Sequence, residues 1–237
     1  MTGRVVSIRH GDRPYDDRVA AFFAGRGIAV EERAPFKGEA LGLPDESVAA
    51  CVIYGGPFNA FALDAHPFLS EENRWLEGCM AKGMPLLGIC QGAQQIAHLL
   101  GAEVGPKPGE PHEFGYYPIY PTEAGKGFLP GSLHVSQCHY HGFALPDGAE
   151  HLAYSEAFPN QAMRYGETTY AFQFHPEVTR DGFRRWQEAP WAAYGKPGAQ
   201  TREEQDALGA EHDQAQHDWF MGFLDDFFGP FLAERAA

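Results

Sequence analysis

The chain has no long uninterrupted apolar run among its 237 residues. A membrane-spanning helix needs about 20 consecutive, mostly apolar residues, and a secretory leader needs an apolar core after its basic start. The opening sequence, MTGRVVSIRHGDRP, contains no such core. We therefore expect a cytoplasmic protein with no membrane partner.

Basic residues are scarce. Lys and Arg number 18 against 32 Asp and Glu, which gives a formal net charge of −14 at pH 7. Proteins that bind nucleic acids or anionic membrane surfaces do so through clustered positive charge. The charge balance argues against nucleic acid as a partner.

Cysteines are few as well, and they are scattered: Cys51, Cys79, Cys90 and Cys138. No C-x-x-C pair is present, which argues against a zinc or thiol-exchange motif. A chain of this length buries enough surface to fold without disulfides. We expect four thiols.

Apolar residues, in contrast, are sufficient for a sizeable core, at 44% of the chain. Apolar runs at residues 5–8, 49–54 and 85–90 end in glycine-rich or polar turns and predict buried strands. Residues 70–82 form a helical pattern with Ser70 as its N-cap. Its apolar stripe consists of Trp75, Leu76, Cys79 and Met80. This alternation predicts an α/β fold with a parallel sheet between helices.

The second half changes character. Short β-like pieces at residues 134–137, 151–155, 162–165 and 170–175 predict that the sheet becomes mixed. A helix is expected over residues 201–228, ending in an aromatic stripe that runs from Trp219 to Phe228. We expect the stripe to pack on the chain's own core, with a homodimer interface as the alternative. The expected domains are therefore 1–178 and a C-terminal helical extension, 179–237, packed on the same domain.

Cys90 occupies the most informative segment. An apolar strand runs into Gly88-Ile-Cys-Gln-Gly92, and a helical pattern follows at once. In the serine counterpart of this arrangement, flanking glycines permit a sharp turn that exposes the nucleophile, and the next N–H points at the developing oxyanion. A helix N-terminus also favours a thiolate. On this segment alone, a buried structural cysteine is the alternative.

A second segment supplies a base. His175 and Glu177 lie two residues apart in Phe174-His-Pro-Glu177, at the end of an expected strand. Side chains two apart on an extended chain share one side, so Glu177 is placed to fix the tautomer of His175. The other ring nitrogen of His175 is then free to face a thiol. This is the arrangement that a nucleophile, its base and a group that orients the base require.

A third segment, residues 52–57, is an expected strand that ends in Gly55-Gly56-Pro57. Glycines at such a position let a backbone N–H approach a ligand closely. We therefore pair the Gly56 N–H with the Gln91 N–H as a candidate oxyanion hole.

Together these segments, with Glu113-Phe-Gly115, resemble class I, triad-type glutamine amidotransferases. The likeness is strongest to members similar to the amidotransferase domain of GMP synthase, because Ser155-Glu-Ala-Phe-Pro-Asn-Gln-Ala162 resembles a segment common there. The resemblance implies a flavodoxin-like fold and no metal or organic cofactor. It implies that Cys90 attacks the side-chain amide of glutamine, giving a γ-glutamyl thioester, while His175 shuttles the proton and Glu177 orients it. The implied oxyanion and substrate-binding residues are Gly55, Gly56, Gln91 and Gln94.

The sequence departs from the family at three places. Residue 93 is Ala where the family often has His, and residue 91 is Gln where an apolar or aromatic residue is usual. Residues 139–143 are His139-Tyr140-His141-Gly142-Phe143, where relatives commonly have Trp-His-Gly-Asp. In the family this stretch lies near the amino-acid end of the substrate, so we expect it to bind substrate and Phe143 to admit a bulkier or less polar compound. A zinc site of His139, His141 and Cys138 is the alternative, but it lacks a fourth ligand.

Three functions follow from these residues. The first is a glutaminase that passes ammonia to a separate synthase, since we find no P-loop motif and expect no synthetase domain after residue 178. The second is a free-standing γ-glutamyl hydrolase that uses the same thioester and another leaving group. The third is a non-catalytic binding module. A cysteine-elbow family of peptidases and glyoxalase-like proteins is a rarer alternative, in which a histidine typically follows the cysteine directly.

Overall fold

The structure, a computed structural model, describes residues 3–12, 14 and 16–234. Its main sheet has nine strands in the order β2-β1-β3-β4-β11-β10-β9-β6-β7. These are β2 Val30–Arg33, β1 Arg4–Ile8, β3 Val48–Ile53, β4 Leu86–Ile89, β11 Thr169–Phe172, β10 Ala162–Tyr165, β9 Ala149–Tyr154, β6 Glu113–Pro121 and β7 Leu133–His139. A small second sheet pairs β5 Val104–Pro106 with β8 His141–Phe143. The helices are α1 Arg18–Ala24, the 3₁₀ turn η1 Pro35–Lys37, α2 Pro67–Ala81, α3 Gln91–Leu99, α4 Arg180–Gln187 and α5 Arg202–Glu234.

The main sheet has a parallel half and an antiparallel half. The strands from β2 to β11 pair in parallel, and those from β11 to β7 pair antiparallel. The α/β fold with a mixed second half is thus confirmed. Because β3, β4 and β11 are adjacent and parallel, their carboxyl ends lie at one edge of the sheet, where the segments that follow them meet.

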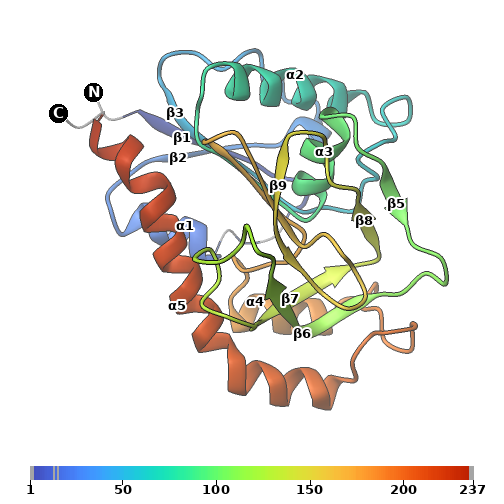
Figure 1. The fold of residues 1–237 in the computed structure, drawn as a ribbon. Coiled ribbons are helices and arrows are strands. Elements are labelled where there is room, and N and C mark those ends of the chain that lie inside the picture. Colours follow the sequence, from blue (N-terminus) through green and yellow to red (C-terminus); the bar gives the residue numbers. More distant parts are fainter. Residues whose placement is uncertain (1–2, 13, 15, 235–237) are drawn as a thin grey trace.

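Two helical layers cover the sheet (Figure 1). In β1, Val5 packs in the core cluster that includes α1 and α5, whereas Val6 packs in the cluster that includes α2 and α3. In β4, Leu87 belongs to the first of these clusters and Leu86 to the second. Side chains alternate across a strand, so strands buried on both faces read as continuous apolar runs. Fully burying such a side chain contributes about 1.5–3 kcal/mol.

Two expected boundaries were wrong. The helix expected from Ser70 begins at Pro67, with His66 as an N-cap that makes no side-chain bond, and Ser70 lies inside it. Proline is favoured in the first helical turn, where its missing N–H costs no hydrogen bond, and this explains the earlier start. The strand expected to reach His175 ends at Phe172, and the chain then bends.

The aromatic stripe of α5 contacts the chain's own core. Phe223 lies 5.0 Å from Phe172 and 5.1 Å from Tyr170 between ring centroids, and Phe228 lies 5.2 Å from Phe23 of α1. The helix continues past the expected end to Glu234, with Pro230 inside it. In the described part of the chain, no helix has both the length and the apolar character to cross a membrane.

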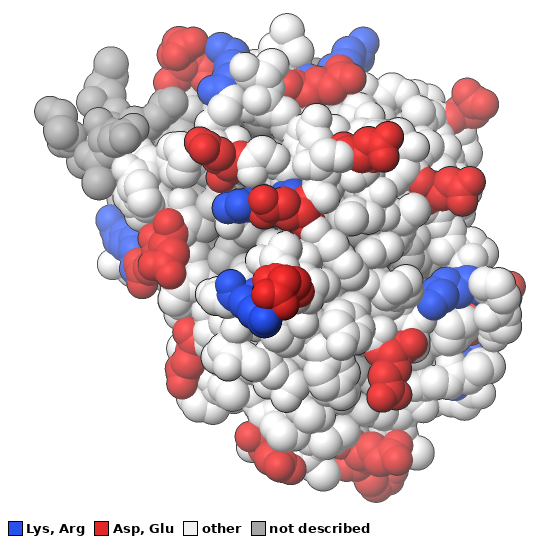
Figure 2. Space-filling view, viewed as in Figure 1, with Lys and Arg blue, Asp and Glu red and all other residues white. Residues whose placement is uncertain are grey.

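Charge is dispersed on the face shown in Figure 2. Asp and Glu side chains form separate small groups there, and the visible Lys and Arg side chains mostly lie beside them. Arg164 and Glu150 form one of the exposed ion pairs of the protein. On this face no basic patch is visible.

Candidate active site

Cys90 lies directly after β4 and is the N-cap residue of α3. Its backbone has φ 53° and ψ −108°, one of two positive φ values at a non-glycine residue among the described positions. A side chain in that region strains the backbone, and such strain concentrates at functional sites. The sharp turn holds the thiol at the carboxyl edge of the sheet, with the side chain 8% exposed.

The glycines that flank Cys90 allow close approach rather than a special backbone angle. A Cβ built on Gly92 would lie 2.2 Å from the Ile53 carbonyl oxygen, and one on Gly88 would lie 2.8 Å from the Gly92 oxygen. Neither glycine has a positive φ. The flanking glycines thus let α3 pack closely against β3 and β4 at the sharp turn, while Cys90 itself adopts the strained angle.

His175 and Glu177 occupy a tight turn after β11. The His175 Nδ1 lies 2.8 Å from Glu177 Oε1, and both side chains are buried. Arg18 of α1 holds the turn, since its Nη1 donates to the Pro176 carbonyl at 2.9 Å and its backbone N–H donates to the Glu177 carbonyl. The contact expected from an extended chain therefore forms, but a turn brings the two side chains together.

Cys90 and His175 meet at Gly55. A Cβ on Gly55 would lie 2.9 Å from His175 Cε1 and 3.2 Å from Cys90 Cβ. Burial by itself would lower the pKa of His175, but the Glu177 carboxylate and the Cys90 thiol beside it raise the pKa of His175 to about 10. An imidazolium that faces a cysteine in this way is suited to stabilise a thiolate.

Two backbone N–H groups near Cys90, those of Gly56 and Gln91, donate to no acceptor in the described part of the protein. Gln91 follows Cys90 in the chain, and Gly56 lines the same cavity. The Gln91 side chain is buried, and its Oε1 accepts from the Phe58 N–H at 2.9 Å. The Gln91 side chain therefore connects α3 to the loop that carries Gly56. The sequence did not indicate this role, although it showed that Gln91 stands where relatives have an apolar or aromatic residue.

One cavity of about 860 Å³ opens onto Cys90. Of the residues expected at the site, seven line it: Gly55, Gly56, Cys90, His139, Tyr140, His175 and Glu177. Gln91, Gln94 and His141 lie outside its lining. The Gln94 Nε2 donates to the His141 carbonyl at 3.3 Å and to Gln173 Oε1 at 3.1 Å, so its amide supports the cavity wall from behind.

His139 is bound on both ring nitrogens. Nδ1 lies 2.9 Å from the His141 carbonyl oxygen, and Nε2 lies 3.0 Å from Glu113 Oε2. Ser155 and Gln161 also donate to Glu113, at 2.6 and 2.7 Å. The Glu113 and Ser155 segments thus share a buried network beneath the cavity. Neither nitrogen of His139 is available to a metal, and no cluster of three or more His, Cys, Asp or Glu suited to a metal occurs within the described residues.

Phe143 requires a correction. Its side chain is 5% exposed in the core cluster that includes α2 and α3, and it lies outside the lining of the Cys90 cavity. Phe143, the apolar residue after His-Gly, therefore packs in the core. The size and polarity of the cavity are set by other residues.

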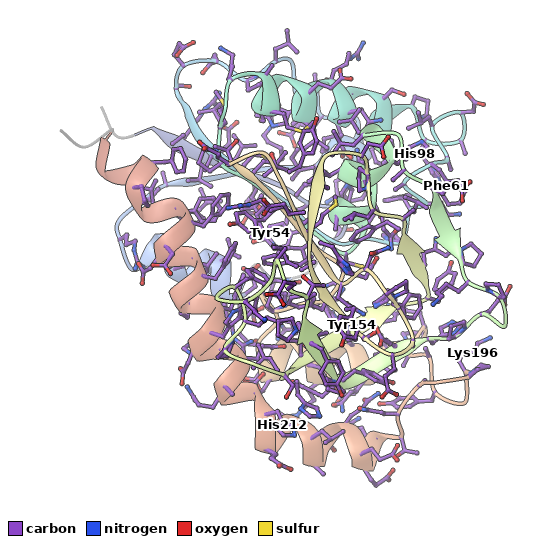
Figure 3. The ribbon with its side chains drawn as sticks, viewed as in Figure 1. Tyr54, Phe61, His98, Tyr154, Lys196 and His212 are labelled. Carbon is purple, nitrogen blue, oxygen red and sulfur yellow. The ribbon has the colours of Figure 1, made fainter. Side chains whose placement is uncertain are left out.

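The opposite wall of the cavity was not expected from the sequence. Trp186 of α4 lies 4.7 Å from His175 between ring centroids, edge to face, and Trp191 lies 6.5 Å from Trp186. Both line the cavity, as does Lys196 on the loop between α4 and α5 (Figure 3). The only sequence signal was a pair of tryptophans in a stretch that otherwise resembles a polar linker.

Known proteins resemble this chain in sequence and in fold. The family model for glutamine amidotransferase class-I matches residues 30–185. The glutamine amidotransferase-like protein YfeJ of Salmonella typhimurium is 32% identical over 162 residues, which are 65% of this chain and 67% of YfeJ. GMP synthase (glutamine-hydrolyzing) of Neisseria gonorrhoeae is 38% identical over 109 residues, 43% of this chain. The match spans one fifth of that enzyme's length.

Solved structures agree over almost the whole chain. A glutamine amidotransferase from Thermotoga maritima superimposes with a TM-score of 0.85 and 29% identity, covering 96% of this chain and 99% of its own. A structure from Methylobacillus flagellatus has a TM-score of 0.83 at 21% identity, covering 99% of this chain and 95% of its own, and shows the shared fold. The fold, the family model and the relatives agree that this chain belongs to the class-I glutamine amidotransferase family.

Proposed function

We propose that the chain hydrolyses a γ-glutamyl amide through a covalent thioester on Cys90. The observation that carries this proposal is the buried contact of His175 with Glu177 on one side and with Cys90 on the other. Nucleophile, base and orienting group then act as one unit. Family membership places this chemistry among glutamine-dependent amide reactions.

The reaction has two halves. The Cys90 sulfur bonds to the γ-carbonyl carbon, and the oxyanion that forms is held by the N–H groups of Gly56 and Gln91. The carbon–nitrogen bond then breaks, and His175 gives its proton to the leaving amine. Water next attacks the thioester, His175 takes a proton from it, and glutamate leaves as the thiol is regenerated.

Glutamate release from glutamine and from γ-glutamyl amines by the purified chain tests the proposal. Cys90→Ala should abolish release, whereas Cys79→Ala, which changes a thiol on α2 outside the cavity, should retain it. Iodoacetamide at neutral pH followed by peptide mapping should label Cys90 first. Preferential labelling of Cys138, or turnover by Cys90→Ala, would contradict the assignment.

A synthase partner is the second candidate. GMP synthase relatives match this chain over about one fifth of their length, so in them the matching part is joined to a much longer remainder. By analogy, ammonia made at Cys90 would pass to a separate synthase chain. Ammonia release from glutamine should then rise when the partner is present. A coupled assay for ammonia, run in extracts with and without size fractionation, measures this rise.

A further inference from the structure

We infer that the Cys90 cavity contains a leaving-group subsite that binds an amine carrying both an aromatic group and a carboxylate, so that the preferred substrate is a γ-glutamyl aromatic amino acid. This inference rests on the proposed function, since it concerns what is attached to the nitrogen that leaves. The subsite consists of Trp186, Trp191 and Lys196, all of which line the cavity with Cys90.

The size of the cavity is the first argument. Pockets of about 300–1,000 Å³ usually hold drug-sized ligands, and this one measures about 860 Å³. Glutamine is much smaller than such ligands, and its leaving group is ammonia. A substrate that fills the cavity must therefore extend beyond the scissile bond.

The position of Trp186 gives the direction of that extension. The leaving nitrogen has to come within hydrogen-bond reach of His175, because His175 supplies its proton. Trp186 packs on His175 at 4.7 Å, so a substituent on that nitrogen lies along Trp186, and Trp191 continues the wall outward. Aromatic groups favour offset or edge-to-face contacts with such a wall, at about 4.5–7 Å between centroids.

The charged residues that line the cavity indicate which chemical group the far end of the substituent carries. Arg9 pairs with Asp17, Arg185 with Asp16, and His175 with Glu177. Lys196 makes no ion pair with the described residues, and it is an exposed residue of the cavity lining. A carboxylate on the leaving amine complements this ammonium group, as the α-carboxylate of an amino acid does.

Competing substrates test the subsite. We expect kcat/KM for γ-glutamyl-phenylalanine to exceed that for γ-glutamyl-alanine and for glutamine at least tenfold. Trp191→Ala should reduce the ratio of γ-glutamyl-phenylalanine to γ-glutamyl-alanine toward one, and Trp191→Phe should restore most of it. Tyr154→Ala removes an exposed aromatic side chain of β9 outside the cavity and should leave the ratio unchanged.

A second comparison tests the charge. Lys196→Ala should raise KM for γ-glutamyl-phenylalanine about three- to tenfold but have little effect on γ-glutamyl-phenethylamide, which lacks the carboxylate. Lys126→Ala, on a distant surface pair with Glu123, serves as the control. Equal losses on both compounds would overturn the carboxylate assignment.

The outcomes separate the two proposals. Hydrolysis that depends on Cys90 but shows no preference for the phenylalanine compound, or a preference that Trp191→Ala leaves intact, overturns the subsite and spares the proposed function. Failure to release glutamate from any of these compounds overturns both.

Discussion

At the residue scale, the proposed mechanism predicts that the pair formed by His175 and Glu177 sets the pH range of the reaction. Glu177 raises the pKa of His175, and in the proposed mechanism the imidazolium supplies the proton to the leaving amine. Glu177→Gln removes that negative charge, so the pKa of His175 falls. The alkaline limb of kcat/KM should therefore move to lower pH, and nitrogen NMR of the His175 ring should follow the same shift.

The size of the loss in turnover should also distinguish the roles of His175 and Glu177. His175→Ala removes the proton-transfer group and should lower turnover by roughly 10²- to 10⁴-fold. Glu177→Gln keeps an oxygen that accepts from Nδ1 and should cost less. Equal or reversed losses would mean that the two roles are misassigned.

The proposed oxyanion hole gives Gln91 a role for its side chain as well as its backbone. Gln91→Met removes the acceptor of the Phe58 N–H and should loosen the loop that carries Gly56. We expect kcat to fall about tenfold, the equivalent of ~1.4 kcal/mol, with little change in KM. Gln187→Met, which removes a buried amide that bonds to Gln205 and does not line the cavity, is the matched control and should leave kcat unchanged.

At the element scale, α5 meets β7 through two stacked histidines. The rings of His134 and His212 lie 3.9 Å apart and nearly parallel. Burial, and then the nearby His212, lower the pKa of His134, while Glu211 acts in the opposite direction. A histidine with a lowered folded-state pKa binds protons more readily when unfolded, so stability is lost as the pH falls below its ordinary value of 6.5.

His134→Gln should therefore reduce the pH dependence of stability. Urea unfolding at pH 7.5 and 5.5 measures the change in the free energy of unfolding for each protein. We expect the wild type to lose more between these pH values than the variant does. The same loss in both would show that the stacked pair does not govern the docking of α5.

At the scale of the whole molecule, α5 supports the turn that carries His175. Arg18 Nη2 binds Asp213 of α5 at 2.8 Å, while its Nη1 binds the Pro176 carbonyl. Gln216 of α5 accepts from the Ser136 N–H, and Ser136 Oγ lies 2.5 Å from the His175 carbonyl oxygen. The C-terminal helix thus acts on the site from outside the region that the family model matches.

Asp213→Asn tests this connection. Breaking a largely buried ion pair by removing one charge is costly, at up to ~3–5 kcal/mol, so we expect lower stability and a several-fold lower kcat. Asp225→Asn is the matched control, because Asp225 also joins α5 to an arginine, Arg26, which follows α1, but at an exposed position. If the two variants lose the same fraction of kcat, the connection to the catalytic turn is absent.

Much of the fold was predictable, because strands that are buried on both faces form continuous apolar runs in the sequence. The runs at residues 5–8, 49–54 and 85–90 coincide with β1, β3 and β4 within one or two residues. β6 was not predicted, since Pro118 and Pro121 interrupt its pattern and its pairing partners, β7 and β9, follow later in the chain. The division at residue 178 and the oligomeric state stay predictions.

The sequence by itself determined which residues are the candidates for the chemistry, because a strand, a glycine-flanked cysteine and a helix form a local pattern, and so does His-Pro-Glu. Only the tertiary structure decided how they are held and what they face. Distant segments, such as Arg18, Asp213 and Gln216 behind the turn and Trp186 and Trp191 in front of it, come together only when the layers pack. Phe143 was misread for the same reason: whether a residue beside a motif faces a cavity or the core depends on packing, which spacing along the chain does not encode.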